Sequence, residues 1–180
     1  MVSSVTAIRA TTAQAVYDHP EILRQQITSG QLWEIAPDSV GGLLLIRPFY
    51  VDFAGLGAAV GGTIDDACTQ VIPLGRVRLR PLQTLRDRQE ALEIRATYAE
   101  QLADIITRPT ATERAQALIQ QLHQWLPGNL ALVISATQAA GLVGVLPTTV
   151  TQAWSCPLDT AMAAPKAIAP DGRGSSRVCR

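Results

Sequence analysis

Histidine, cysteine and paired acidic side chains are the residues with which this chain could catalyse a reaction or bind a metal. Neither histidine, His19 or His123, has a carboxylate or cysteine at the spacing of a metal ligand or catalytic partner. Cys68, Cys156 and Cys179 are widely separated and match neither a zinc site nor a redox pair. We therefore expect reduced thiols, no metal site and no catalytic triad.

A glycine-rich segment at 55–62 is the best indication of an enzyme in this sequence. Four of its eight residues are glycine, as in a loop that binds a dinucleotide. Such a site also needs an acidic residue after a second strand, about 20 residues farther on. Asp65 and Asp66 come too early, and arginines occupy 76–80. A glycine-rich connection between strands explains the segment better, so we predict that the protein is not an enzyme.

The segment 136–154, ATQAAGLVGVLPTTVTQAW, has the pattern of two short helices joined by a tight turn. Such helices need a small residue where they approach closely and a turn residue that tolerates positive φ. Ala140 and Gly144 meet these requirements, and Pro147 suits the first turn of a helix. Five apolar residues fall at inward positions: Ala139, Val143, Val145, Val150 and Ala153. The segment predicts a helix-turn-helix, with an ordinary two-helix corner as the alternative.

The residues before this segment predict the elements that position it. Ser135 to Gln138 form a capping box for the first of the two helices. Thr112 is placed to cap a helix over 113–126. A Pro-Gly-Asn turn follows that helix, and the apolar residues 130–134 predict a short strand.

Residues 82–106 contain no proline or glycine and predict one long helix. An apolar residue recurs every seven positions: Leu85, Leu92, Ala99 and Ile106. Leu102 and Ala103 extend this stripe in the second half, whereas polar residues interrupt it in the first half. The stripe either lies on the preceding domain or pairs with its twin in a dimer.

Residues 31–80 are rich in β-formers in short segments that are separated by glycine, proline or aspartate, and they predict a small β domain. Residues 75–80 alternate arginine with apolar residues, which predicts an edge strand with one basic face. That face is either solvated or contacts an acidic partner. Residues 13–28 predict a helix that Pro20 splits in two.

The order of a β region, a long helix, an amphipathic helix, a short strand and a helix-turn-helix resembles the Crp/Fnr superfamily of dimeric transcription regulators. The resemblance is clearest over 112–154 and weaker over 31–106. It implies an α+β fold with a shortened β-roll sensor, a long dimerisation helix and a winged-helix-like DNA-binding domain. The domains implied are 1–81 for the N-terminal helices and β-roll, 82–108 for the connecting helix, 109–156 for the helix-turn-helix domain and 157–180 for a disordered tail.

The same resemblance implies which residues contact DNA. It places Thr148, Thr149, Thr151 and Gln152 on the early turns of a recognition helix, which enters the major groove. Glutamine can bind adenine with two hydrogen bonds, and threonine can contact phosphate or a thymine methyl group. Arg114 is the expected side-chain contact to phosphate, and Leu85, Leu92, Ala99 and Ile106 would form the dimer. The partners implied are double-stranded DNA, a second copy of the chain and RNA polymerase.

The chain departs from that family in its expected ligand site. Members that bind cyclic nucleotides carry a Gly-Glu pair and a later Arg-Ser or Arg-Thr pair. The corresponding stretch, 60–70, has Gly62 in place of the glutamate, contains no arginine, and offers Asp65 and Asp66, which would repel a phosphate. Four cysteines for an iron–sulfur site are also lacking in this region. We expect no response to cAMP and no cofactor.

A second departure concerns charge and the end of the chain. Between Thr110 and Cys156 the only full charges are Glu113 and Arg114, although DNA-binding modules normally neutralise several phosphates. Residues after Trp154 lack the pattern of a two-stranded wing. These features favour an alternative, a degenerate paralogue that dimerises or binds a protein partner without binding DNA.

Composition limits the remaining classes. Fifteen basic and fifteen acidic residues give a net charge of 0, so no global field attracts nucleic acid or an anionic membrane. The chain is 47% hydrophobic, but no apolar run approaches the roughly 18 residues needed to span a bilayer. The N-terminus lacks the pattern of a signal peptide. We expect a cytoplasmic protein with no membrane contact.

Overall fold

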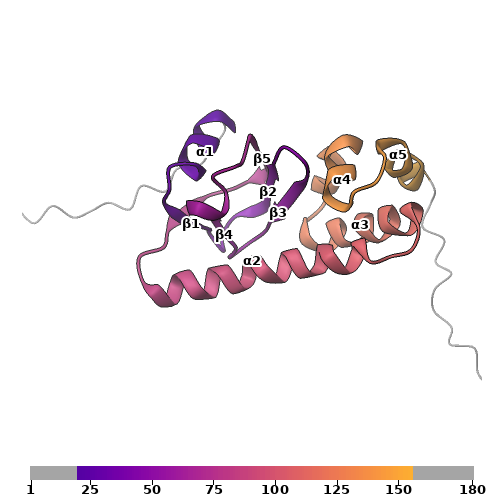
Figure 1. The fold of residues 1–180 in the computed structure, drawn as a ribbon. Coiled ribbons are helices and arrows are strands. Elements are labelled where there is room, and N and C mark those ends of the chain that lie inside the picture. Colours follow the sequence, from indigo (N-terminus) through magenta and orange to yellow (C-terminus); the bar gives the residue numbers. More distant parts are fainter. Residues whose placement is uncertain (1–19, 156–180) are drawn as a thin grey trace, which may run out of the picture.

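A computed structural model describes residues 20–155, which form a mixed α+β fold with five α-helices and six strands (Figure 1). Helix α1 (Pro20–Ile27) is the second part of the predicted N-terminal helix. The first part of that helix, the predicted tail and Cys156 and Cys179 lie outside the described residues. No helix between residues 20 and 155 has both the length and the apolarity required to cross a membrane.

The β region forms two antiparallel sheets of three strands each. One sheet has the order β4-β1-β6, with β1 (Leu32–Ile35), β4 (Ala59–Gly61) and β6 (Leu79–Pro81). The other has the order β3-β2-β5, with β2 (Val40–Ile46), β3 (Val51–Ala54) and β5 (Gln70–Arg76). A short 3₁₀ helix, η1 (Gly62–Ile64), follows β4. The two sheets and α1 share one apolar core, which includes Leu23, Ile35, Leu43, Val60 and Val71.

The prediction of a single strand over 75–80 is wrong. Strand β5 ends at Arg76 beside β2, and β6 begins at Leu79 beside β1, so the chain crosses here from one sheet to the other. Val77 is fully buried at the crossing. Arg78 pairs with Asp38, and Arg80 pairs with Glu34 at 2.5 Å. Two of the three arginines are therefore occupied within the chain.

The long helix α2 (Leu85–Ile106) begins three residues later than predicted. The reason is a capping box: the Thr84 hydroxyl accepts the Asp87 N–H at 3.1 Å, and the Thr84 N–H donates to the Asp87 carboxylate at 3.4 Å. In Figure 1, α2 runs beneath the sheets and continues beneath the C-terminal helices. It contacts β3 and β4 as well as α3 and α4.

Four short elements follow α2 and form a helical unit: α3 (Ala111–Trp125), the 3₁₀ helix η2 (Leu130–Val133), α4 (Ala136–Val143) and α5 (Pro147–Ser155). The sequence had suggested Thr112 as the cap of α3, but the cap is Thr110. Glu113 stands three residues after Thr110, so its carboxylate accepts the Thr110 N–H while the Thr110 hydroxyl accepts the Glu113 N–H.

The predicted strand at 130–134 is also wrong, because this segment forms η2. The Leu132 N–H donates to the Asn129 carbonyl at 3.0 Å, and the Ile134 N–H donates to the Ala131 carbonyl at 3.4 Å. These local hydrogen bonds satisfy the backbone without a neighbouring strand. Apolar composition alone does not distinguish these two outcomes.

The sheets and the helical unit meet across a continuous apolar core. Phe53 of β3 stacks on Trp125 of α3 with ring centroids 4.6 Å apart, and Tyr98 of α2 packs edge-on against both rings. Helix α4 lies against β3, where a Cβ atom on Gly141 would stand 2.5 Å from a methyl group of Val51. Close packing at Gly141 therefore sets the distance between α4 and the sheet.

This contact yields a stability prediction. Alanine is normally favoured over glycine within a helix by about 1 kcal/mol. We expect Gly141→Ala to lower the free energy of unfolding instead, by about 1 to 2 kcal/mol, because its methyl group overlaps Val51. The variant Val51→Ala and the double variant complete a cycle measured by urea denaturation. The double variant should lose less stability than the sum of the single variants; additive losses would contradict the contact.

Candidate functional site

The two short helices and the tight turn predicted over 136–154 are present as α4 and α5. Ser135 caps α4: its hydroxyl accepts the Gln138 N–H at 3.2 Å, and its own N–H donates to the Gln138 side chain at 2.8 Å. Helix α4 ends at Gly144, which has φ 63° and ψ 48°. The left-handed conformation favours glycine, so the residue that the pattern required stands where the turn needs it.

The inner faces of α4 and α5 pack as the pattern requires. Ala139, Val143, Val150 and Ala153 are buried, and Val145 is half-buried. Both helices also pack against α3, so three helices share one core. The inner side of α5 is therefore packed in this core, and its outer side is exposed.

The outer face of α5 carries the residues assigned to DNA contact. Thr148, Thr151 and Gln152 are exposed, and Thr149 is half-buried. The Thr151 hydroxyl donates to the Pro147 carbonyl at 3.1 Å, so its oxygen retains the capacity to accept a hydrogen bond. The amide of Gln152 can both donate and accept. The exposed face of α5 is therefore neutral and rich in hydrogen-bonding groups.

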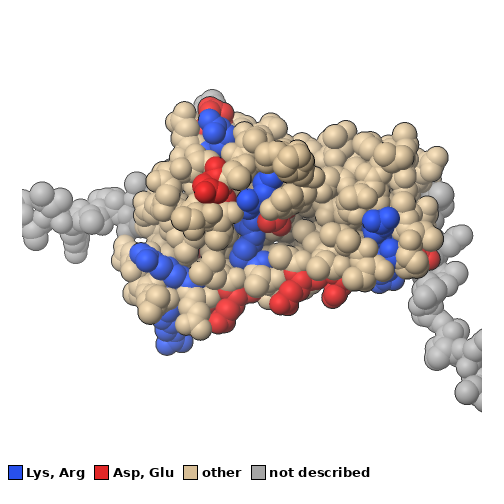
Figure 2. Space-filling view, viewed as in Figure 1, with Lys and Arg blue, Asp and Glu red and all other residues tan. Residues whose placement is uncertain are grey.

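Arg114 has a less open position than the sequence suggested. It lies half-buried near the start of α3, and its Nε atom is buried without a hydrogen-bond partner among the described residues. Helices α4 and α5 contain no charged residue. Figure 2 accordingly shows an uncharged surface over α4 and α5, in the upper right of the view. Electrostatic attraction of a phosphate backbone by this surface is weak.

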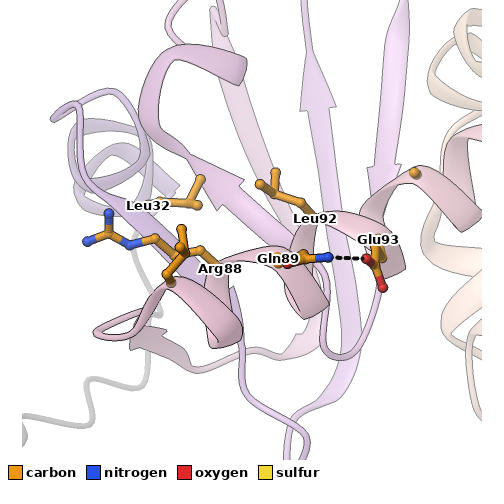
Figure 3. A pocket seen from close by; sticks show the side chains of 7 residues that line it. Leu32, Arg88, Gln89, Leu92 and Glu93 are labelled. Carbon is orange, nitrogen blue, oxygen red and sulfur yellow. Dashed lines mark hydrogen bonds between the residues drawn. The ribbon is translucent and has the colours of Figure 1, made fainter.

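The heptad stripe of α2 lies on the surface. Leu85, Leu92, Ala99 and Ile106 are all exposed, so the stripe does not pack on the β region of its own chain. Beside it, α2 and β1 enclose a shallow groove of about 540 Å³. Leu32, Leu85, Leu92 and Ala96 supply apolar walls, and Figure 3 shows Arg88 and Glu93 at opposite ends of the groove. An apolar strip with charged flanks suits a helix partner.

The buried face of α2 lies about a quarter turn from the stripe, includes Leu102, which had been predicted to extend the stripe, and contains a residue whose role the sequence did not reveal. Ala91, Arg95, Leu102 and Ile105 are buried, with Tyr98 half-buried in the same row. The Arg95 guanidinium donates to the Asp52 carboxylate at 2.5 Å and to the Ala59 carbonyl at 3.3 Å, and lies 3.5 Å from Asp65. Helical spacing places residues 91, 95, 98, 102 and 105 on one face. An arginine on this otherwise apolar face could have indicated a buried carboxylate partner.

Asp65 is the most buried charged residue of this group, with 0% exposure. Its carboxylate accepts the Gly61 N–H at 2.8 Å and a guanidinium N–H of Arg47 at 2.6 Å. Burial raises the pKa of Asp65 above its usual value, although Arg95, the Gly61 N–H and Arg47 act in the opposite direction. The sequence had suggested an aspartate that repels phosphate; the structure shows a carboxylate already neutralised by two arginines.

Cys68 is a buried free thiol beside this group. Its Sγ donates to the Gln70 carbonyl at 3.1 Å, and burial raises the pKa of the thiol. It is therefore protonated and unreactive at neutral pH. Among residues 20–155, no three His, Cys, Asp or Glu side chains are placed to hold a metal ion. His123 is exposed on α3.

Comparison with known proteins adds no family to this description. No protein-family model matches the chain, and no curated protein sequence matches it significantly.

Proposed function

We propose that the protein is a homodimeric DNA-binding transcription regulator of the Crp/Fnr type that does not respond to cAMP and has no catalytic activity. The observation that carries this proposal is the helix-turn-helix of α4 and α5. Its turn glycine has the required positive φ, its inner faces are packed, and the outer face of the second helix is exposed. An exposed outer face is what a recognition helix requires to enter a groove.

The remaining elements can be assigned to the parts of such a regulator. We assign the two three-stranded sheets to a shortened β-roll within 1–81, α2 to the dimerisation helix within 82–108, and α3 to α5 to a winged-helix-like domain within 109–156. The continuous core from the sheets through α2 to α3 would transmit the position of the β region to α5. A regulator of this kind works in the cytoplasm with RNA polymerase as a partner.

The chemistry of DNA recognition would rest on hydrogen bonds. Gln152 can pair with adenine, and Thr148, Thr149 and Thr151 can contact phosphate or a thymine methyl group. Backbone N–H groups in the first turns of α3 and α5 would donate to phosphate as well, apart from those of residues such as Glu113 and Thr149, which are already paired within the chain. Arg114 would add the one cationic side chain of this unit.

The exposed stripe of α2 supports the dimer. Two copies of Leu85, Leu92, Ala99 and Ile106 would bury each other in a helix pair, and the groove beside Leu32 would extend the contact. The absence of arginine in 60–70 and the internal pairing of Asp65 argue against cAMP, since a cyclic phosphate would need a free cation there.

A second candidate function is binding of a protein partner by the helical unit without DNA. Leu132, Val133 and Leu146 are 61%, 69% and 69% exposed in a part of the chain with one acidic and one cationic residue. Exposed apolar side chains on an uncharged surface suit a protein interface better than a phosphate backbone. The two candidates differ in what they predict for DNA binding.

The recognition helix gives the first test of function. On DNA fragments selected by the full-length protein, Gln152→Ala should weaken binding by about 1 to 3 kcal/mol and leave binding to random DNA nearly unchanged. The matched control is Gln25→Ala, an exposed glutamine on α1. Fluorescence anisotropy measures both. A sequence preference that survives Gln152→Ala removes the proposed mode of recognition.

Salt dependence gives an independent test. Log affinity should fall with log salt concentration by a slope of about −2 for a dimer, because each copy neutralises about one phosphate through Arg114. Anisotropy titrations over a range of salt concentrations measure this slope. No sequence preference at low salt would favour the second candidate function, whereas a steep slope would mean that residues outside 111–155 supply the cations.

The dimer is tested at the middle of the stripe. Leu92→Glu places a charge where two copies of α2 would meet, so it should convert a dimer to a monomer at about 50 μM, measured by sedimentation equilibrium. Leu132→Glu changes a leucine that is exposed on η2 and should leave the dimer intact. A monomeric wild-type protein, or a dimer that Leu92→Glu leaves intact, contradicts the assignment.

A further inference from the structure

Three segments far apart in the sequence meet at the Asp65 carboxylate. Asp65 directly follows η1, Arg47 begins the turn between β2 and β3, and Arg95 lies in the middle of α2. Arg47 donates to Asp65 at 2.6 Å and to the Ile64 carbonyl at 2.7 Å. With the Gly61 N–H, two guanidinium groups and one backbone amide converge on a single carboxylate that solvent does not reach.

This convergence has the composition of an anion-binding site. Guanidinium groups and backbone N–H groups are the donors with which proteins bind carboxylate and phosphate. Asp52, which also pairs with Arg95, is 18% exposed at its side chain and donates nothing to the site. It balances the second cation, so the four charged side chains sum to zero. The Asp65 side chain alone fills the centre.

We propose that the carboxylate of Asp65 is an internal ligand, which occupies this anion site from within the chain and thereby fixes the position of α2 on the β region. The sheets contact α2 through β3 and β4, and Arg95 is the cation on α2 that reaches both Asp52 and Asp65. The exposed apolar stripe runs along α2 about a quarter turn away from this buried face. Asp52 holds Arg95 by a hydrogen bond and Asp65 holds it by an ion pair, so together these carboxylates set the direction in which the stripe faces.

The energetics of the charged group fit a role in positioning α2 and not only a role in stabilising the fold. Buried ion pairs recover little more than the cost of removing their charges from water, whereas loss of one member leaves its partners unpaired at high cost. For Asp65 the effect of burial outweighs that of its cationic neighbours. Well-packed apolar side chains could hold α2 as strongly, so the contribution we assign to the charged group is the arrangement of the three segments that its directional hydrogen bonds join.

The test is chemical rescue of the full-length chain. Asp65→Ala empties the site and leaves Arg47 and Arg95 unpaired, so amide exchange in residues 91–99 should accelerate on the order of 100-fold. About 0.1 M sodium formate, a free carboxylate of matching size, should restore at least about a tenth of the protection. Sodium chloride at the same ionic strength should not. Hydrogen exchange with mass spectrometry measures each state.

Asp66→Ala is the matched control, since Asp66 is the neighbouring residue, has the same side chain and is exposed. It should change neither exchange in α2 nor the response to formate. Asp65→Asn keeps the shape of the side chain but removes its charge; it should also accelerate exchange, without rescue, because the amide fills the space. If Asp65→Ala folds only with formate, that result supports the proposal.

Two outcomes overturn the proposal. In the first, residues 91–99 exchange as slowly in Asp65→Asn as in Asp66→Ala. This comparison also overturns the proposal if Asp65→Ala does not fold under any condition. In the second, formate protects Asp65→Ala no more than chloride does, which would reduce Asp65 to a structural residue without an anion site around it.

Discussion

Helix α2 has a buried face and an exposed apolar stripe, and the rest of the structure depends on this division. One face is buried from Ala91 onward, first against β4 and β3 through Ala91 and Arg95, and then against α3 and α4 through Leu102 and Ile105. The exposed apolar stripe runs beside this face, and most of the remaining surface of α2 is charged or polar. Because a helix is rigid over this length, the position of its buried face on the sheets also determines where the helical unit lies.

Charge is divided as unevenly as packing. Helix α1, the β region and α2 contain the ion pairs of the described residues, including the buried group around Asp65, whereas residues 111–155 contain only Glu113 and Arg114 as full charges. A surface without cations gains little from counterion release. Any partner of α5 would therefore be bound through hydrogen bonds and apolar contacts, whose strength depends on close geometric fit. The three-helix core behind α5 provides the rigidity that such a fit requires.

Features specified over a few residues could be predicted from the sequence. The capping box at Ser135, the positive φ at Gly144 and the inward residues of α4 and α5 each depend on neighbours within about one helical turn. The exposed stripe of α2 also follows from helical spacing. By contrast, a strand was predicted over 130–134 from composition and over 75–80 from alternation, and a strand forms only where another strand is free to pair with it.

The sequence by itself determined the helices, the cap of α4, the tight turn between α4 and α5 and the apolar stripe, because each arises from the stereochemistry of a short segment. The tertiary structure alone decided which sheet each strand joins, that α4 packs on β3 at Gly141, and that Arg95, Asp65, Arg47 and Asp52 come together. These contacts join residues far apart in the chain, as in the hydrogen bond between Arg95 and Asp52, which are 43 positions apart. Their pairing depends on how whole elements pack. A charged residue within a helical pattern does not by itself indicate which residue it pairs with.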